Sequence, residues 1–451
     1  MRPCQSRTSR MHLPAIVSVF VLLPCLQVRG EDTGKEVGAE LPAKAEQGVE
    51  QHRKGEAVIR FQDRQGQPVA NVPVRIRQTG HEFLFGCIAF DLVRSNDLYK
   101  PDLWKQRFSE LFNFAVFPFY WSGYERQPGV TTRDDILEAV KWCQANGITT
   151  KGHPLVWTNP AGIPRWTQQY PPEKSEELVL DRVQREVAGF AGRIDIWDVV
   201  NEPIHCRAWK NVAAEAYRQE QIPDIADYVD KAFRTAHEAN PGARLILNEF
   251  YVIAREADRE RFYQLVTELK RRGTPISGLG IQAHEPREEW FAPEKVWATL
   301  DRLGSLGYPL HITEYIPQSG GKPITGSWRE GTWTEQTQAE FADQFYRLCF
   351  GHPAVVSINW WGLSDRQIWL PGGGLLDSEY QPKPVYNRLK DLIRRQWNTS
   401  IDARTDTDGR ITFHGFYGLY EIAIEPENHP QRTYQIALYK DKQNQWVFME
   451  D

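Results

Sequence analysis

Eight short apolar runs recur through the middle of the chain, and this rhythm constrains the fold more than any other feature. Amphipathic stretches such as "DILEAVKWCQANG" and "ERFYQLVTELKRRG" lie between most of them. Apolar runs that alternate with helical stretches are typical of βα units and a parallel sheet. Eight such units over roughly 300 residues predict an α/β fold, a closed (β/α)8 TIM barrel. The runs are "FLFG", "NFAVF", "TKGHPLVW", "IDIWDVVNE", "RLILNEF", "GLGIQAH", "LHITEY" and "VVSINWW".

The N-terminus predicts export. Residues 1–30 have the pattern of a signal peptide, because arginines precede the apolar run "LPAIVSVFVLLPCL" and small Gly30 follows at a plausible cleavage point. The run is too short, and too closely followed by charge, to be read as a membrane span. The sequence therefore predicts a secreted or periplasmic protein without a membrane span.

Two end segments flank the expected barrel domain, which covers residues 81–396. Residues 31–55 are charged and poor in large apolar side chains, which predicts a linker. Residues 56–80 and 397–451 instead alternate apolar and polar positions, which predicts strands. We expect small β segments at both ends of the barrel, forming an accessory module whose role is structural rather than sugar-binding.

Composition narrows the classes of partner. A net charge of −5 gives no reason to expect nucleic acid. The chain has 16 Trp and 17 Tyr, whose flat rings fill cores and also stack on the apolar faces of sugars.

Four cysteines remain after the predicted signal peptide: Cys87, Cys143, Cys206 and Cys349. Their spacing favours none of the three full pairings, and no CxxC or clustered His/Cys pattern indicates zinc. Buried thiols, or a single structural bridge, are the simpler interpretation.

Most of the apolar runs end in polar or aromatic residues. On a barrel these side chains converge on the face where the C-terminal ends of the strands meet, which is where barrel enzymes carry their active sites. A strand that only fills a core has no need to end in a carboxylate. The strand-end residues are His153, Trp157, Asn201, Glu202, Asn248, Glu249, Gln282, His284, Glu314, Trp360 and Trp361.

The motifs "WDVVNEP" and "ITEY" resemble the acid/base and nucleophile motifs of glycoside hydrolase family 10, the retaining endo-β-1,4-xylanases. Supporting matches are "GHPLVW", "LNEF", "IQAH" and "WWGLSDRQIW" running on to "GLLDSEYQPKPVY". The resemblance covers about residues 57–396 and respects the order of the eight strands. It implies a pair of catalytic carboxyls, with Glu202 as acid/base and Glu314 as nucleophile.

Retaining hydrolysis needs two carboxyls about 5–5.5 Å apart, one protonated and one ionised, so their surroundings must separate the two pKa values. The two carboxyls suffice for the reaction, so neither a cofactor nor a metal is expected. The resemblance further implies that Asn201 bonds the sugar 2-hydroxyl and that His284 orients Glu314. The remaining residues that it implies around the sugar are Gln282, His153, Trp157, Trp361 and Trp369.

Two motifs depart from the family pattern. The family follows the third-strand Trp with His-Ser-Gln, whereas Trp157 is followed by "TNP". After the second strand the family carries Glu-Asn and then a Lys-Trp pair that grips the next sugar, whereas this chain has "FPFYWSGYERQPG" and no matching Lys. We expect Tyr120, Trp121, Tyr124 and Glu125 to build that subsite differently, with Trp121 as a stacking platform.

The sequence thus predicts a monomeric glycosidase that acts on β-1,4-xylan or a related plant or algal polysaccharide. Two alternatives remain open: a hydrolase of another β-glycan, such as a glucan or mannan, and a non-catalytic glycan-binding barrel. Product formation separates them, since a binding protein retains polysaccharide and releases nothing.

Overall fold

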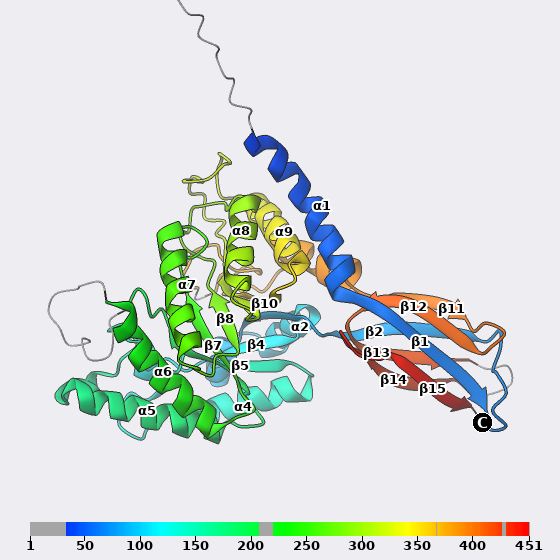
Figure 1. Ribbon diagram of the computed structural model, residues 1–451, viewed down its shortest axis with the longest axis horizontal. Helices are drawn as coiled ribbons and strands as arrows, with labels where there is room; N and C mark the ends of the chain where they lie inside the picture. Colours follow the sequence, from blue (N-terminus) through cyan, green and yellow to red (C-terminus); the bar gives the residue numbers. More distant parts are fainter. Residues whose placement is uncertain (1–32, 207–219, 367, 426–429, 451) are drawn as a thin grey trace, which may run out of the picture.

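The computed structural model describes residues 33–206, 220–366, 368–425 and 430–450, and it consists of a (β/α)8 barrel with a β-sandwich beside it (Figure 1). The barrel is closed and parallel, in the order β10-β3-β4-β5-β6-β7-β8-β9. Each of the eight predicted runs supplies one strand, so the predicted fold is confirmed. The strands are β3 (Leu84–Ile88), β4 (Phe114–Pro118), β5 (Thr149–His153), β6 (Ile196–Asn201), β7 (Arg244–Glu249), β8 (Gly278–Ile281), β9 (Leu310–Tyr315) and β10 (Val355–Trp360).

Helices cover the outside of the barrel and bury one apolar face each. In α6, for example, Ile225, Val229 and Phe233 recur at the spacing of one helical face and are fully buried. Proline stands in the first turn of α2, α5, α6, α8 and α10, where its missing N–H costs no hydrogen bond. The helical elements are η1 (Phe90–Asp97), α2 (Pro101–Leu111), α3 (Trp121–Tyr124), α4 (Arg133–Ala145), η2 (Arg165–Gln169), α5 (Pro172–Gly189), α6 (Ile222–Ala239), α7 (Glu256–Arg271), α8 (Pro293–Gly304), α9 (Glu335–Gly351), α10 (Pro384–Asp391) and the π-helical η4 (Leu392–Gln396).

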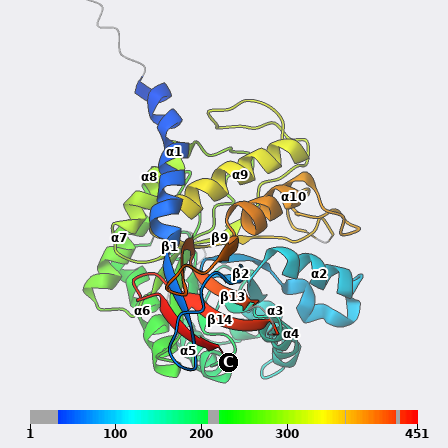
Figure 2. The ribbon, with the colours of Figure 1, turned by 90° about the vertical axis from the view of Figure 1, so that its right-hand side faces the viewer.

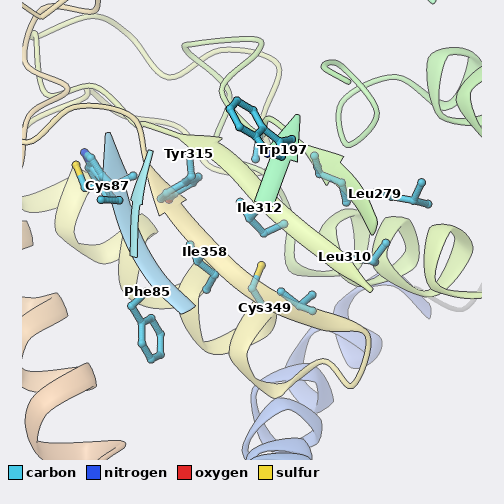
Figure 3. Close-up of a cluster of buried hydrophobic side chains, with 14 of the residues drawn as sticks. Phe85, Cys87, Trp197, Leu279, Leu310, Ile312, Tyr315, Cys349 and Ile358 are labelled. Carbon is cyan, nitrogen blue, oxygen red and sulfur yellow. The ribbon is translucent and has the colours of Figure 1, made fainter. Parts of the chain in front are cut away.

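The barrel strands are buried on both faces, which explains why their sequences read as nearly continuous apolar runs. Figure 3 shows part of this core, where Ile312, Ile358 and Tyr315 lie close to Cys349. Cys87, Cys143, Cys206 and Cys349 are all buried free thiols, in agreement with the simpler interpretation of the cysteines.

The β-sandwich is built from both ends of the chain. One sheet has the order β12-β1-β15 and the other β11-β2-β13-β14, so one N-terminal strand lies between two C-terminal strands in each. Ile59, Phe61, Ile76 and Ile422 fill a core separate from that of the barrel. The strands are β1 (Lys54–Asp63), β2 (Pro73–His81), β11 (Ser400–Arg404), β12 (Arg410–Phe416), β13 (Gly418–Ile424), β14 (Arg432–Leu438) and β15 (Gln445–Glu450).

The prediction of a linker over residues 31–55 is wrong, because Thr33–Arg53 form helix α1. Leu41, Ala45 and Val49 follow one another at four-residue spacing and are buried, so three modest apolar side chains make a sufficient helical face. Helix α1 packs against α9 and α8 and leads directly into β1 (Figures 1 and 2). Arg53 ends it by donating hydrogen bonds to the carbonyls of Phe350, His352 and Val355, at 2.6, 2.6 and 2.7 Å.

The predicted signal peptide, residues 1–30, lies outside the described residues. Within the part of the chain that is described, no helix is long and apolar enough to cross a membrane.

Candidate active site

A cavity of about 500 Å³ opens where the C-terminal ends of the barrel strands meet. Glu202 and Glu314 both line it, from the ends of β6 and β9, which are separated by β7 and β8 in the barrel wall. Four of the aromatic and imidazole side chains that the sequence predicted for the site line the same cavity, and they are Trp157, His284, Trp361 and Trp369.

Glu202 follows directly after β6 and has a left-handed backbone conformation, with φ of 56°. Its N–H donates to the carbonyl of Asn248 at 2.8 Å, which turns the chain out of the strand at this residue. The side chain then accepts hydrogen bonds from Trp157 Nε1 to Oε2 at 2.7 Å and from Gln282 Nε2 to Oε1 at 3.1 Å. The backbone turn and these two donors fix the carboxyl at the wall of the cavity.

A second strand-end glutamate, Glu249, stabilises this turn through hydrogen bonds. It is fully buried and accepts hydrogen bonds from the N–H of Ile204 at 2.9 Å and from the N–H of Phe250 at 2.9 Å. His205 Nδ1 lies 2.8 Å from the same carboxylate. Glu249 does not line the cavity, so it supports the segment that carries Glu202.

Glu314 belongs to β9 itself and is 4% exposed. Asn248 Nδ2 donates to its Oε1 at 2.8 Å. Two imidazoles face it as well, with His284 Nε2 at 3.4 Å from Oε2 and His153 Nε2 at 3.8 Å from Oε1. Glu314 therefore has polar partners on both oxygens within a nearly closed site.

Amide side chains connect the two carboxyl groups. Gln282 Nε2, which donates to Glu202, also lies 3.2 Å from Asn201 Oδ1. Asn248 Nδ2 donates to the same Asn201 oxygen at 2.7 Å and to Glu314. Thr313 Oγ1 donates to Asn248 Oδ1 at 2.6 Å and so fixes which way this amide faces. One hydrogen-bond network thus orients both carboxyl groups.

The surroundings of Glu202 favour its protonated form. Burial and the negative charge of Glu314 raise its pKa, while the hydrogen bonds from Gln282 and Trp157 act in the opposite direction without cancelling them. A carboxyl held protonated beside a second carboxyl is the arrangement that acid-assisted cleavage of a glycosidic bond requires.

His153 lies at the end of β5 and is oriented from both sides. Its Nδ1 is 2.7 Å from Asp198, which also pairs with the buried Lys151, and its Nε2 is 3.1 Å from the hydroxyl of Tyr120. Trp361 packs edge-on against His153, with ring centres 5.0 Å apart. Three residues that the sequence predicted for the site therefore lie directly beside the two carboxyls and not at the cavity mouth: His153, Asn201 and Gln282.

Trp369 stands at the mouth of the cavity. It is 43% exposed, its ring centre is 5.4 Å from that of His284, and the guanidinium of Arg287 lies over it at 4.7 Å. An exposed indole fixed in this way presents a flat apolar face toward the solvent side of the site.

The prediction that Trp121 forms a stacking platform is wrong. Trp121 is 4% exposed, donates from Nε1 to Glu125 at 3.0 Å and packs edge-on against Trp166. Residues 121–124 form the single helical turn α3, which points this indole into the protein and leaves Tyr120 at the cavity. The sequence offered no periodicity over so short a segment from which to tell the two faces apart.

Sequence reasoning named Asn248 as a strand-end residue but gave it no role, and it assigned none to Asp198. Both lie on barrel strands and act through another side chain, Asn248 through Glu314 and Asp198 through His153. Their polar character inside otherwise apolar runs is the feature that distinguishes them. Within the described ranges, no group of three or more His, Cys, Asp or Glu side chains could hold a metal ion.

Known proteins resemble this chain in sequence and in fold. The family model described as "Glycosyl hydrolase family 10" matches residues 119–392. The chain is 31% identical over 266 residues to endo-1,4-beta-xylanase B of Thermotoga neapolitana, covering 57% of this chain and 73% of that one. It is 27% identical over 397 residues to anti-sigma-I factor RsgI6 of Acetivibrio thermocellus, covering 88% of this chain but only 48% of that protein. The solved structure of xylanase 10B from Thermotoga maritima superposes with a TM-score of 0.58 at 26% identity, covering 70% of this chain and 96% of that one.

A (β/α)8 barrel with paired carboxyls at the C-terminal ends of its strands has the architecture of a glycoside hydrolase, and the chain spans about half the length of the anti-sigma-I factor. The family match covers more than half of the chain, and the expected family is thereby confirmed. The chain belongs to glycosyl hydrolase family 10.

Proposed function

We propose that this chain is an exported, monomeric hydrolase of a β-1,4-linked polysaccharide of the xylan type. The observation that carries the proposal is the pair of carboxyls that line one cavity and are joined by amide side chains, with the pKa of Glu202 raised by burial and by the charge of Glu314. Export rests on the composition of residues 1–30 alone.

The proposed reaction has two displacements. Glu314 attacks the anomeric carbon while the bond to the leaving oxygen breaks, and Glu202 gives that oxygen its proton. Glu202, now ionised, then takes a proton from water as the water attacks the same carbon and releases Glu314. Two inversions return the β configuration to the new reducing end.

Substitution of each glutamate by glutamine tests the two roles. Glu202→Gln should lower turnover of polysaccharide by about 10²–10⁴-fold, because general acid catalysis is worth that much. With an aryl glycoside whose leaving group needs no proton, this variant should still form the covalent glycosyl-enzyme, which mass spectrometry detects. Glu314→Gln should form none with either substrate.

Glu288→Gln is the matched control, since Glu288 pairs with Lys322 and lies outside the residues that line the catalytic cavity. Proton NMR of the first products should show the β anomer. Near-normal polysaccharide turnover by either catalytic variant, or a first-formed α anomer, would contradict the assignment. Polysaccharide binding without any release of product by the unmodified protein would instead support the glycan-binding alternative.

A further inference from the structure

A second cavity, of about 470 Å³, lies beside the catalytic one, and we call it the side cavity. Phe90 and Tyr120 line both, so the two cavities meet at this pair of rings, which pack edge-on with centres 6.2 Å apart. The other residues around the side cavity are Val93, Pro118, Gly123, Tyr124, Arg126, Val130, Thr131, Thr132 and Asp135.

The lining suits a neutral sugar. Phe90 and Tyr120 offer aromatic surface, and Thr131 and Thr132 offer hydroxyls for hydrogen bonds. Arg126 and Asp135 bring one charge of each sign, so the lining favours neither an anion nor a cation. The volume lies within the range of about 300–1,000 Å³ that is usual for small-molecule sites.

The catalytic cavity has its own extension away from the two carboxyls. It continues along Ile88 and Asp91 after β3 and along Ser364 and Arg366 after β10. A polysaccharide main chain therefore has a path that does not use the side cavity. The side cavity leaves this path at Tyr120, whose hydroxyl is 3.1 Å from His153 beside Glu314.

We propose that the side cavity binds a neutral sugar branch on the polysaccharide, carried by one of the sugars next to the cleaved bond on the non-reducing side. The inference rests on the proposed function and extends it to the substrate class. It also gives a physical reason for the departure of "FPFYWSGYERQPG" from the family pattern: this segment walls a branch site.

Hydrogen bonds on the side of α3 that faces away from the side cavity stabilise the cavity wall. Glu125 accepts hydrogen bonds from Trp121 Nε1 at 3.0 Å and from the N–H of Gly129 at 2.8 Å. Trp166 Nε1 donates to the Glu125 carbonyl at 2.9 Å. Trp121 thereby fixes α3 and the cavity wall without touching the ligand, and a preformed wall saves the cost of ordering it on binding.

Gly123 keeps the side cavity open. A Cβ at this position would have no described atom within 4 Å, and its backbone does not take the left-handed conformation that favours glycine. A larger side chain can therefore be introduced here without backbone strain, and it would occupy space that a branch needs. Gly242 is a matched control, because a Cβ there would meet only Asn240 Oδ1, at 3.5 Å.

The experiment compares hydrolysis of a linear xylo-oligosaccharide with that of the same chain carrying one α-linked arabinofuranosyl branch. Gly123→Leu should lower the ratio of kcat/KM for the branched over the linear substrate at least tenfold, whereas Gly242→Leu should leave the ratio unchanged. In the products of the unmodified protein, the branch should lie on one of the two sugars at the new reducing end.

Binding measured on the Glu202→Gln background keeps this test separate from that of the proposed function. Calorimetry should show the branched ligand bound more tightly than the linear one, and the added Gly123→Leu change should abolish that preference. An unchanged ratio and an unchanged preference in Gly123→Leu would overturn the branch site while leaving the hydrolase intact. Absence of hydrolysis with a retained branch preference would overturn the proposed hydrolase and keep the branch site.

Discussion

The two site glutamates show how surroundings divide one residue type into two chemical roles. Glu314 accepts a hydrogen bond from the amide of Asn248, and the imidazoles of His284 and His153 lie 3.4 and 3.8 Å from its carboxylate oxygens. Glu202 is buried, faces the charge of Glu314 and has only two neutral donors, the indole of Trp157 and the amide of Gln282. This asymmetry is what an acid and a nucleophile need at one pH.

The pH dependence of hydrolysis should follow Glu202. The acid acts only when protonated, so activity on polysaccharide should fall as the pH rises through its raised pKa. The Trp157 hydrogen bond favours the ionised form, so Trp157→Phe should raise this pKa further and move the alkaline limb of the kcat/KM profile to higher pH. Trp166→Phe makes the same change where the indole N–H bonds Glu125, and it should leave the limb in place. A limb that moves to lower pH in Trp157→Phe would contradict this account of Glu202.

At the residue scale, the positions of Glu202 and Glu314 were predictable because a carboxylate at the end of an apolar strand has few structural uses. The direction in which the Trp121 side chain points was not predictable. A single turn of backbone decides whether an aromatic side chain in a loop faces solvent, ligand or core. The turn at residues 121–124 buries the Trp121 indole against Trp166. The partners of Glu314 were partly predictable: the sequence indicated His284 beside Glu314, whereas His153, expected only around the sugar, also faces Glu314 and is oriented by Asp198.

At the scale of elements, the strands were easier to predict than helix α1. A parallel barrel strand is buried on both faces, so its sequence is a nearly continuous apolar run that can be recognised directly. Among residues 40–53, whose side chains the structure describes, helix α1 buries the apolar side chains of Leu41, Ala45 and Val49, and its close approach to α9 depends on glycine rather than on large side chains. The low apolar content of this segment is therefore the reason why its buried helical face was not predicted.

The contact between α1 and α9 can be tested at Gly351, the last residue of α9. A Cβ there would overlap the Ala45 carbonyl oxygen, which is backbone and has no room to move. Gly351→Ala should therefore lower the free energy of unfolding by about 1–3 kcal/mol, as overpacking does, and increase hydrogen exchange of residues 40–53. Gly242→Ala adds the same methyl group at an open surface position and should change neither quantity. Equal stability of the two variants would show that α1 is not fixed by this contact.

At the scale of the whole molecule, the sandwich ties the two ends of the chain together. β1 lies between β12 and β15, and β2 lies between β11 and β13, so each N-terminal strand has only C-terminal neighbours.

The junction with the barrel is aromatic: Phe350 of α9 packs on Trp397 and Phe416, and His81 at the end of β2 packs on Phe350 as well. Arg53 adds its three hydrogen bonds to barrel carbonyls at the same place. The sandwich thus packs against the barrel at this junction, and the structural role of the end segments stays a prediction.

This interleaving predicts that C-terminal truncations have graded effects. Removal of residues 444–451 takes away edge strand β15 and leaves β1 paired with β12, so the protein should remain monomeric with a lower Tm. Removal of residues 398–451 takes away every neighbour of β1 and β2 and exposes Ile59, Phe61 and Ile76, which are fully buried in the intact chain. Unpaired apolar strands associate edge to edge, so this truncation should aggregate even though all the barrel strands are present. Size-exclusion chromatography with circular dichroism distinguishes the two outcomes. The account is wrong if the longer truncation stays monomeric and melts no lower than the shorter one. That result would show that β1 and β2 do not need the C-terminal strands to cover them.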